Sequence, residues 1–272
     1  AIESADSITT VSRTYAQEIL NPWFSYSLDR ILRDRQWKLR GIVNGIDVDT
    51  YNAETDTHIA ANFTASNVRG KARDKMELQK ELGLPVEKDI PLMVMVTRLA
   101  GHKGLDLVRY MFDEIMKCKI QVAILGTGES EYEWFFHEKA NQYPDKFKFV
   151  CDFNAGLSHR FYAGADMFLM PSKQEPCGLS QMIALRYGTV PIVRATGGLA
   201  DTITDAGEKD GVGYTFKSYN AHDMFGAISR ALGAYEQKKV WREIMRNGME
   251  RDLTWDASAK EYIKMYNEIT GC

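Results

Sequence analysis

The sequence of 272 residues has few cysteines and histidines and no excess of positive charge. The four cysteines, Cys118, Cys151, Cys177 and Cys272, show no CxxC spacing, which indicates reduced thiols rather than a disulfide framework. The five histidines have no metal-ligand spacing with cysteines or acids, so we expect no metal site. The formal net charge of -3 lacks the basic footprint of nucleic-acid-binding proteins, and we expect no nucleic-acid partner.

Long apolar runs, leader-like segments and internal repeats are missing as well. No run approaches the roughly 18 apolar residues of a membrane-spanning helix, so we expect no membrane contact. The first residues lack the charged and apolar regions of a signal peptide. Together with the cysteine pattern, these absences favour a cytoplasmic location. The hydrophobic share of 44% is enough for a folded core in one or two domains.

From residue 90 onward, short apolar runs alternate with amphipathic segments. The apolar runs predict strands at 92–96, 122–125, 147–150, 167–170, 190–193 and 213–216. Between them, helices are predicted at 104–117, 132–143 and 157–164, and two more after Gly178 and Thr196. Other helices are expected at 71–83, 220–234, 238–249 and 254–270. This alternation predicts an α/β fold with a Rossmann-like, doubly wound parallel sheet.

The two ends of the chain differ from this alternating region. A strand is expected at 7–11, followed by a helix at 13–20 that Ser12 caps. Residues 41–47 predict a short strand ending in an Asn-Gly turn, and the polar residues 52–70 predict a surface loop. The last helix carries an apolar stripe that we interpret as core packing: Trp255, Ala259, Tyr262, Ile263 and Tyr266.

The most informative stretch, 166–205, holds two successive strand–loop–helix units. The first loop carries Glu175, and the second carries the glycine pair of Thr196-Gly197-Gly198. Both loops follow neighbouring parallel strands, and open α/β sheets bind ligands at that edge. Backbone N–H groups of a glycine pair at a helix N-terminus can bind an anion, and a loop carboxylate can hold sugar hydroxyls. Alone, each feature is equally consistent with an ordinary turn or a solvated glutamate; together they favour a site.

Three more predicted strand ends carry candidate groups. Arg98 and Lys103 follow the first strand, where two fixed cations would stabilise a leaving diphosphate; by spacing alone, a solvated basic loop is the commoner interpretation. Gly126-Thr127-Gly128 follows the second strand and is a weak signal, because glycine turns are ordinary. Phe153 follows the third strand and could either stack on a base or pack in the core. Convergence on one sheet edge favours a binding site.

Three motifs carry a family resemblance: Glu-Pro-Cys-Gly-Leu at 175–179, Ala-Leu-Arg-Tyr-Gly-Thr-Val-Pro at 184–191 and Thr-Gly-Gly-Leu-Ala-Asp-Thr at 196–202. Together they closely resemble the donor-binding region of bacterial glycogen synthases and plant starch synthases, whose two Rossmann-like domains face a cleft in the GT-B fold. The resemblance implies that residues 41–272 are the C-terminal, nucleotide-sugar-binding domain. Residues 1–40 would be the end of the N-terminal, acceptor-side domain with its linker, and most of that domain would lie outside this sequence.

The resemblance also implies roles for individual residues. Arg98 and Lys103 keep the family's Arg-Leu-x-x-x-Lys-Gly-Leu-Asp pattern, which contacts the donor diphosphate, and Glu175 completes the catalytic set. The implied donor-binding residues are Asn44, Gly126, Thr127, Gly128, Phe153, Cys177, Gly178, Leu179, Ser180, Thr196, Gly197, Gly198 and Leu199. Ile183 stands where the family's Glu-x7-Glu pattern has its second glutamate, so the donor ribose needs another partner. No nucleophilic role is expected for Cys177.

The activity implied by the resemblance is transfer of glucose from ADP-glucose to the non-reducing end of an α-1,4-glucan, with retention of configuration. No cofactor or metal is expected, because cationic side chains and a helix end would stabilise the diphosphate. Expected partners are ADP-glucose, ADP, the glucan and the rest of the N-terminal domain, without which this chain is expected to be inactive. Two alternatives stay open: a nucleotide-sugar-binding module without turnover, and a related transferase that uses UDP-glucose.

Overall fold

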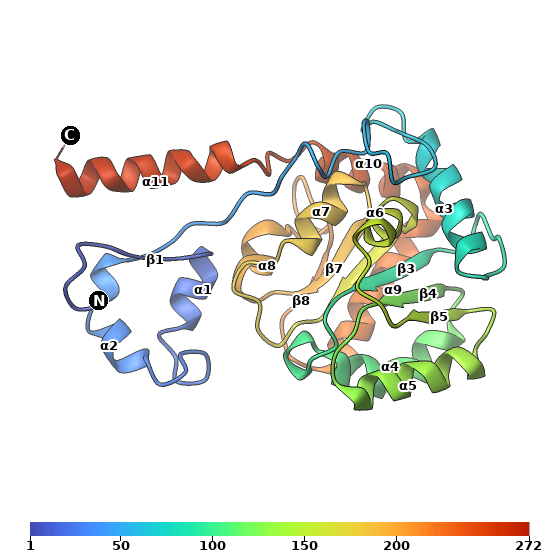
Figure 1. Cartoon of the computed structure of the whole chain (residues 1–272), viewed down its shortest axis with the longest axis horizontal. Coiled ribbons are helices and arrows are strands. Elements are labelled where there is room, and N and C mark those ends of the chain that lie inside the picture. Colours follow the sequence, from blue (N-terminus) through green and yellow to red (C-terminus); the bar gives the residue numbers. More distant parts are fainter. Residues whose placement is uncertain (272) are drawn as a thin grey trace.

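A six-stranded parallel sheet forms the centre of the larger part of the chain in the computed structural model, which describes residues 1–271 (Figure 1). Its strands are β3 (Leu92–Val96), β4 (Gln121–Leu125), β5 (Phe147–Val150), β6 (Met167–Met170), β7 (Val190–Arg194) and β8 (Tyr214–Phe216). They lie in the order β5-β4-β3-β6-β7-β8. The chain therefore fills the sheet outward from β3 on one side, then crosses to β6 and fills the other side. This reversal confirms the predicted doubly wound sheet.

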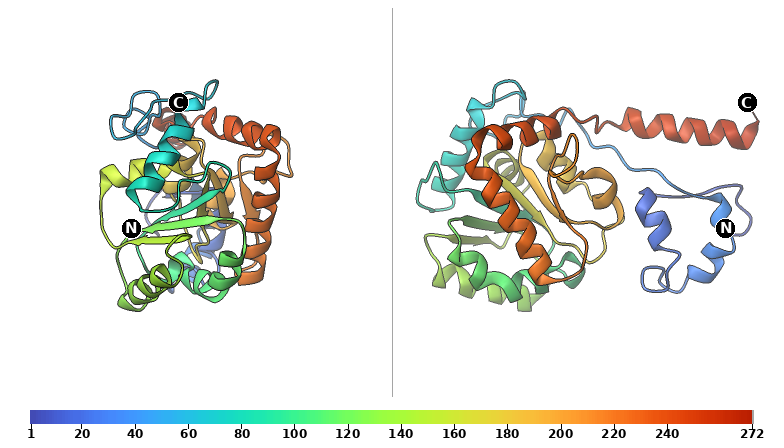
Figure 2. Two further views of the ribbon diagram at one scale, coloured as in Figure 1. Left: turned by 90° about the vertical axis from the view of Figure 1, so that its right-hand side faces the viewer. Right: turned by 180° about the vertical axis from the view of Figure 1, so that it is seen from behind.

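Helices cover both faces of this sheet, as the views in Figures 1 and 2 show. One face packs against α4 (Leu105–Lys117), α5 (Ser130–Gln142), α9 (Ala221–Glu236) and part of α10 (Lys238–Met249). The other packs against α3 (Arg69–Glu81), α6 (Ala155–Gly164) and α7 (Ser180–Arg186). Along β3, Met93 and Met95 enter the first core while Leu92 and Val94 enter the second. Burial on both faces explains why the strands are continuous apolar runs.

A smaller unit formed by the first 41 residues lies beside this sheet (Figure 1). It contains β1 (Ile8–Thr10), α1 (Arg13–Glu18), α2 (Asp29–Arg33), a single 3-10 turn at Gln36–Lys38 and β2 (Leu39–Gly41). Strands β1 and β2 pair in parallel as a separate two-stranded sheet. The strand and helix expected near 7–11 and 13–20 are therefore confirmed.

The strand predicted at 41–47 is wrong. β2 ends at Gly41, and the next residues cross from the smaller unit to the sheet. Beyond Gly41, one hydrogen bond from the Ile42 N–H to the Thr10 carbonyl, over 2.9 Å, continues the contact with β1. Beyond Ile42, the segment leaves β1 and has no neighbouring strand with which to form a ladder. Further along, Ile46 forms an isolated bridge with Thr254, and its N–H donates to the Leu253 carbonyl over 2.9 Å. An apolar segment without a neighbouring strand cannot form a sheet, whatever its composition.

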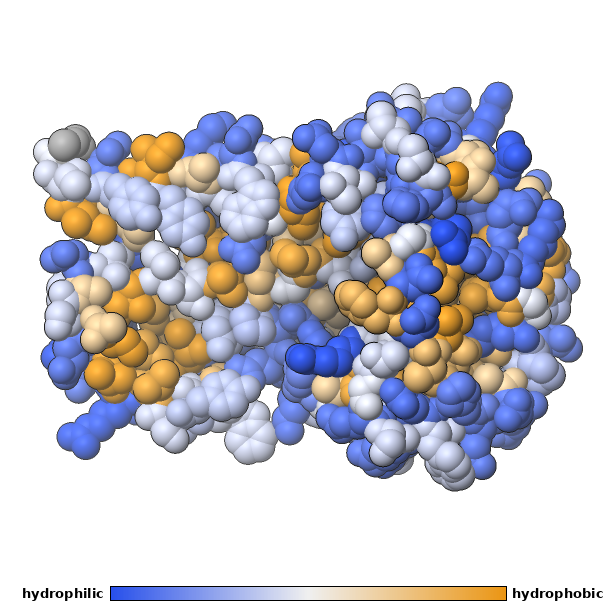
Figure 3. Space-filling view, viewed as in Figure 1, coloured by the Kyte–Doolittle hydropathy of each residue, from blue (hydrophilic) through white to orange (hydrophobic). Residues whose placement is uncertain are grey.

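The core packing predicted for the last helix is also wrong. In α11 (Trp255–Thr270), the stripe residues Trp255, Ile263 and Tyr266 expose 51%, 56% and 56% of their surface. The helix extends beyond the sheet and runs alongside residues 1–41, so only one narrow side of it is covered (Figure 1). In Figure 3, apolar side chains gather on the smaller unit below this helix, and the surface of the helix itself is mixed. Periodicity correctly predicted a helix here but could not show which side has a neighbour.

Helix α1 is joined to the larger part through α8 (Gly197–Thr202), and each helix supplies a carboxylate to the N-terminus of the other. The Asp201 carboxylate accepts hydrogen bonds from the Thr14 N–H at 3.1 Å and the Thr14 hydroxyl at 2.5 Å. In return, Glu18 accepts from the Thr196 hydroxyl at 2.7 Å and from the Gly197 N–H at 3.1 Å. Both carboxylates satisfy N–H groups that a helix leaves unpaired in its first turn.

Replacing Asp201 by alanine should therefore loosen α1. Loss of a helix-capping carboxylate costs about 0.5–2 kcal/mol, so amide hydrogen exchange across α1 should accelerate by about 2- to 30-fold. Peptide-resolved hydrogen–deuterium exchange measures this effect, with the exposed Glu208→Ala as a control of equal charge change. Unchanged exchange in α1 would show that the Asp201 carboxylate does not hold this helix.

Candidate functional site

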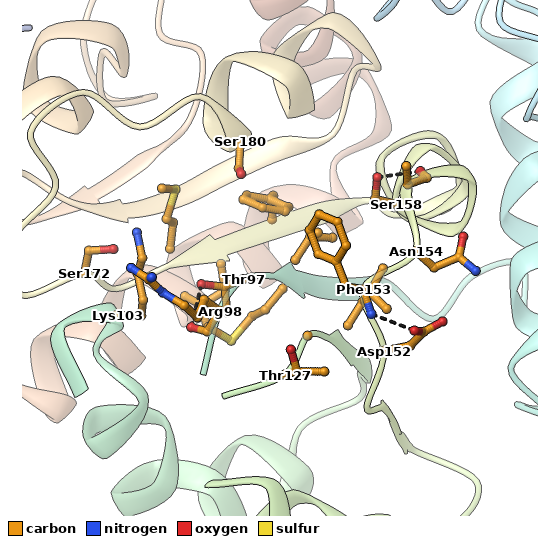
Figure 4. A pocket seen from close by; sticks show the side chains of 18 of the residues that line it. Thr97, Arg98, Lys103, Thr127, Asp152, Phe153, Asn154, Ser158, Ser172 and Ser180 are labelled. Atoms are coloured by element: carbon orange, nitrogen blue, oxygen red, sulfur yellow. Dashed lines mark hydrogen bonds between the residues drawn. The ribbon is translucent and has the colours of Figure 1, made fainter. Parts of the chain in front are cut away.

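A hollow of about 570 Å³ opens at the carboxyl ends of β3, β4, β5 and β6 (Figure 4). This is the topological switch point of the sheet, the usual ligand position in open α/β folds. Six of the residues singled out from the sequence line it: Arg98, Lys103, Gly126, Thr127, Phe153 and Ser180. The hollow therefore brings together candidates from three predicted strand ends and from the start of α7.

One end of the hollow is cationic. Arg98 follows β3 and exposes its guanidinium, and Lys103 ends the 3-10 turn before α4. The Lys103 ammonium lies 2.7 Å from Glu175 Oε2, and the Ser172 hydroxyl donates to the same oxygen over 3.0 Å. Burial and the two neighbouring cations, Lys103 and Arg98, lower the pKa of His102. His102 is therefore uncharged at neutral pH, and the positive charge at this end comes from Arg98 and Lys103.

Glu175 reaches this position because its loop is supported from behind by the start of α8. The Gly198 N–H donates to the Glu175 carbonyl over 3.1 Å. Gly197 has a φ of +45°, and a Cβ atom there would lie 2.0 Å from the same carbonyl oxygen. Only glycine fits this close approach in the left-handed region. The close contact with the glycine pair thus fixes the position of the Glu175 loop at the edge of the hollow.

The backbone amides of this glycine pair face protein acceptors in the structure. Gly197 donates to the Glu18 carboxylate, and Gly198 donates to the carbonyls of Glu175 and Pro176. Binding of a donor phosphate by these amides therefore stays a prediction. Sequence reasoning did not find Glu18 as their partner, because the two segments are 179 positions apart and no local pattern connects them.

The remaining candidates lie around the hollow rather than on its wall. Asn44 lines a second groove of about 380 Å³ between the crossing segment, α8 and the start of α11. Burial raises the pKa of the Cys177 thiol, although a hydrogen bond from the Asn44 backbone opposes this. A protonated thiol agrees with the expectation that Cys177 is no nucleophile. Leu199 is fully buried in the core, whereas Leu179 is 46% exposed.

Gly128, Gly178 and Ile183 also have identifiable surroundings. The Gly128 N–H donates to the Glu133 carboxylate on α5 over 2.8 Å. The Gly178 carbonyl accepts from the side-chain amide of Gln181 over 2.9 Å. Ile183 is buried among apolar residues of the core, so this side chain has a packing function and offers no hydrogen bond to a ribose.

The other end of the hollow is aromatic. Phe153 is 93% exposed, so the alternative that it packs in the core is wrong. Its N–H donates to the Asp152 side chain over 2.7 Å (Figure 4). Asn154 caps α6 by accepting from the Leu157 N–H. Tyr51 lines the same hollow and was missed by sequence reasoning. An aromatic residue soon after the Asn-Gly turn was the only available signal.

Among residues 1–271, no group of three or more His, Cys, Asp or Glu side chains is placed to hold a metal ion. None of the described helices is long and apolar enough to cross a membrane. Cys118, Cys151 and Cys177 are free thiols, whereas Cys272 lies outside the described residues.

Comparison with known proteins agrees with this geometry. A solved structure, the catalytic domain of starch synthase IV from Arabidopsis thaliana bound to ADP and acarbose, superimposes with a TM-score of 0.93. It is 34% identical, and the match covers 100% of this chain and 57% of that one. A protein named glycogen synthase from Anoxybacillus flavithermus is 49% identical over 271 residues, which are 99% of this chain and 56% of the relative. A glycogen synthase of Bacillus cereus is 48% identical, with 98% and 57% covered.

These matches confirm the predicted resemblance and the α/β, GT-B-related fold class. The chain spans about half the length of the curated relatives that it matches. The family profile of the starch synthase catalytic domain matches residues 1–34. The profile of glycosyl transferases group 1 matches residues 75–248, which hold the whole six-stranded sheet and all residues that line the hollow except Tyr51. The chain therefore belongs to the family of glycosyl transferases group 1.

Proposed function

We propose that this chain is the donor-binding part of a glycogen or starch synthase, which transfers glucose from ADP-glucose to the non-reducing end of an α-1,4-glucan with retention. The observation that carries the proposal is the hollow itself, cationic at the Arg98 and Lys103 end and aromatic at the Phe153 end. Its shape and charge suit a nucleoside diphosphate. Support comes from the relatives named glycogen synthase and from the similar starch synthase that was solved with ADP and acarbose.

In this proposal, the diphosphate lies at the cationic end. Negative charge grows on the leaving diphosphate as the glycosidic bond breaks, and Arg98 and Lys103 stabilise that charge more strongly in the transition state than in the ground state. Glu175, which lies 2.7 Å from the Lys103 ammonium, is close enough to bind hydroxyls of the transferred glucose. The two cations supply the charge compensation, so the proposed reaction uses no metal or other cofactor.

We assign residues 1–40 to the N-terminal, acceptor-side domain and its linker, and 41–272 to the nucleotide-sugar-binding domain. The match of the starch synthase profile to residues 1–34 supports this division, as does the separate β1–β2 sheet. The rest of the acceptor-side domain is the proposed partner of the exposed apolar residues on α11 and on the first 40 residues. The whole enzyme is proposed to act in the cytoplasm, where ADP-glucose, ADP and the glucan are its small-molecule and polymer partners.

Calorimetric titration of the 272-residue chain tests the donor assignment. ADP should bind more tightly than UDP, because the base occupies a defined end of the hollow, and ADP-glucose should bind at the same site. Equal affinities for ADP and UDP would contradict the assignment and favour a transferase of another donor specificity. Glucan elongation should require the acceptor-side domain; elongation by this chain alone would exclude a binding module without turnover.

A further inference from the structure

The connection between β2 and α3, residues 42–68, is long and contains only isolated β-bridges. Connections of more than about 12–15 residues without regular structure are uncommon in compact domains and usually functional. The middle of this connection is anchored by Ala53 and Asp56, which are buried with 3% and 7% of their surface exposed. Between its start and these anchors, Tyr51 reaches the wall of the hollow. The proposed function has so far given Tyr51 no role.

Tyr51 packs against the imidazole of His159, which is itself held in place by buried neighbours. Its ring stacks on the imidazole of His159, with centroids 4.9 Å apart and an angle of 24° between the planes. His159 belongs to α6, is 5% exposed, and its Nδ1 lies 2.7 Å from Asp56 Oδ2. The Tyr187 hydroxyl donates to the same Asp56 oxygen over 2.5 Å. Buried polar groups that satisfy one another in this way hold a single arrangement.

The charge on Asp56 explains why the imidazole cannot turn. Burial alone would raise the pKa of the Asp56 carboxyl, but hydrogen bonds from Tyr187, His159 and the His58 N–H outweigh burial and hold this pKa below its ordinary value. The carboxylate is thus an acceptor at neutral pH, and His159 must present a protonated Nδ1 to it. This fixes the plane of the His159 ring and, through stacking, the plane of the Tyr51 ring.

The position of Tyr51 within the hollow suggests what its ring contacts. Phe153 projects at the end remote from Arg98 and Lys103 (Figure 4). A nucleoside diphosphate with its phosphates on the two cations extends its base toward this aromatic end. We infer that Tyr51 is a second wall of the base site, and that His159, held by Asp56, is a positioning residue for it. This inference rests on the proposed function and adds to it how the base is recognised.

Two titrations separate a base contact from a general loss of structure. ADP carries the base, whereas inorganic pyrophosphate contacts only the cationic end. Because stacking of a base on an aromatic ring is worth about 1–3 kcal/mol, Tyr51→Ala should raise the Kd for ADP by about 5- to 150-fold. The Kd for pyrophosphate should change less than about twofold, as expected for a distant site. Tyr51→Phe keeps the ring and should restore most of the lost ADP affinity.

His159→Asn tests the positioning role, because it keeps an N–H for Asp56 but removes the ring beneath Tyr51. It should weaken ADP binding without weakening pyrophosphate binding. Tyr110→Ala removes a 71% exposed tyrosine on α4 and serves as the matched control. A measurement on the unaltered chain avoids any folding defect: ADP, but not pyrophosphate, should shift the NMR signals of the Tyr51 ring protons upfield.

The possible outcomes separate this inference from the function on which it rests. If the unaltered chain fails to bind ADP, both the proposed function and this inference are overturned. If ADP binds and Tyr51→Ala leaves its affinity unchanged, only the inference is overturned. Equal losses for ADP and pyrophosphate would also overturn it, because they would show a structural role. A selective loss for ADP together with the ring-proton shift supports it.

Discussion

Arg98→Ala should weaken ADP binding by about 1.5–3 kcal/mol, the contribution of a hydrogen bond to a charged group, or about a 10- to 150-fold rise in Kd. The guanidinium is exposed at the cationic end of the hollow, so its removal leaves no buried group without a partner. Thermal stability should therefore stay the same while the affinity falls. Calorimetry with ADP and a thermal unfolding curve measure the two quantities on one protein sample.

Arg242→Ala is the matched control for the change in charge. Arg242 is exposed on α10 and does not line the hollow, so its loss should not alter ADP binding. An equal effect of both variants would show that ADP responds to net charge alone. If Arg98→Ala bound ADP as tightly as the unaltered chain, Arg98 would not belong to the proposed site, although it matches the family's Arg-Leu-x-x-x-Lys-Gly-Leu-Asp pattern.

Gly197→Ala should destabilise the fold by about 3 kcal/mol or more, since it combines left-handed strain with a clash. Residue 197 has a φ of +45°, and the added Cβ would lie 2.0 Å from the Glu175 carbonyl oxygen. The substituted chain can relieve the clash only by moving the Glu175 loop away from α8. Folded molecules should therefore also bind ADP-glucose more weakly. Urea denaturation gives the stability, and calorimetry gives the affinity.

Gly226→Ala is the same substitution at a position where we expect it to stabilise the fold rather than destabilise it. Gly226 lies inside α9, and a Cβ there would meet nothing within 4 Å. Alanine is favoured over glycine in a helix interior, so this variant should gain about 0.5–1 kcal/mol. If the two variants had similar stability, the close approach of Gly197 to the Glu175 loop would not be a structural constraint.

Much of the sheet could be predicted from the sequence because its strands are buried on both faces. Met93 and Met95 face one core and Leu92 and Val94 the other, so the strand is one unbroken apolar run. The segment 41–47 also contains buried apolar residues, Ile42 and Ile46, but it connects two units and has no strand beside it after Ile42. Strand pairing depends on a neighbour that composition does not reveal. The prediction that the apolar stripe of α11 packs in the core was wrong for the same reason, because tertiary structure determines which elements lie beside a helix.

The residues of the candidate site that follow strand ends could be predicted from the sequence. Arg98, Gly126 and Phe153 each come within about three residues of the end of a predicted strand, and parallel strands bring their carboxyl ends to one edge. Tyr51 and its support could not be found in this way. They come from a loop without periodicity, and the contact between Asp56 and His159 joins residues 103 positions apart. Such contacts are visible only once the chain is folded.

A crystal structure of the chain with ADP tests the central claim most directly. We expect the diphosphate within hydrogen-bond distance of both Arg98 and Lys103, and the adenine ring against Phe153 at the opposite end of the hollow. ADP bound in the second groove near Asn44, or with its phosphates turned away from the two cations, would contradict the account.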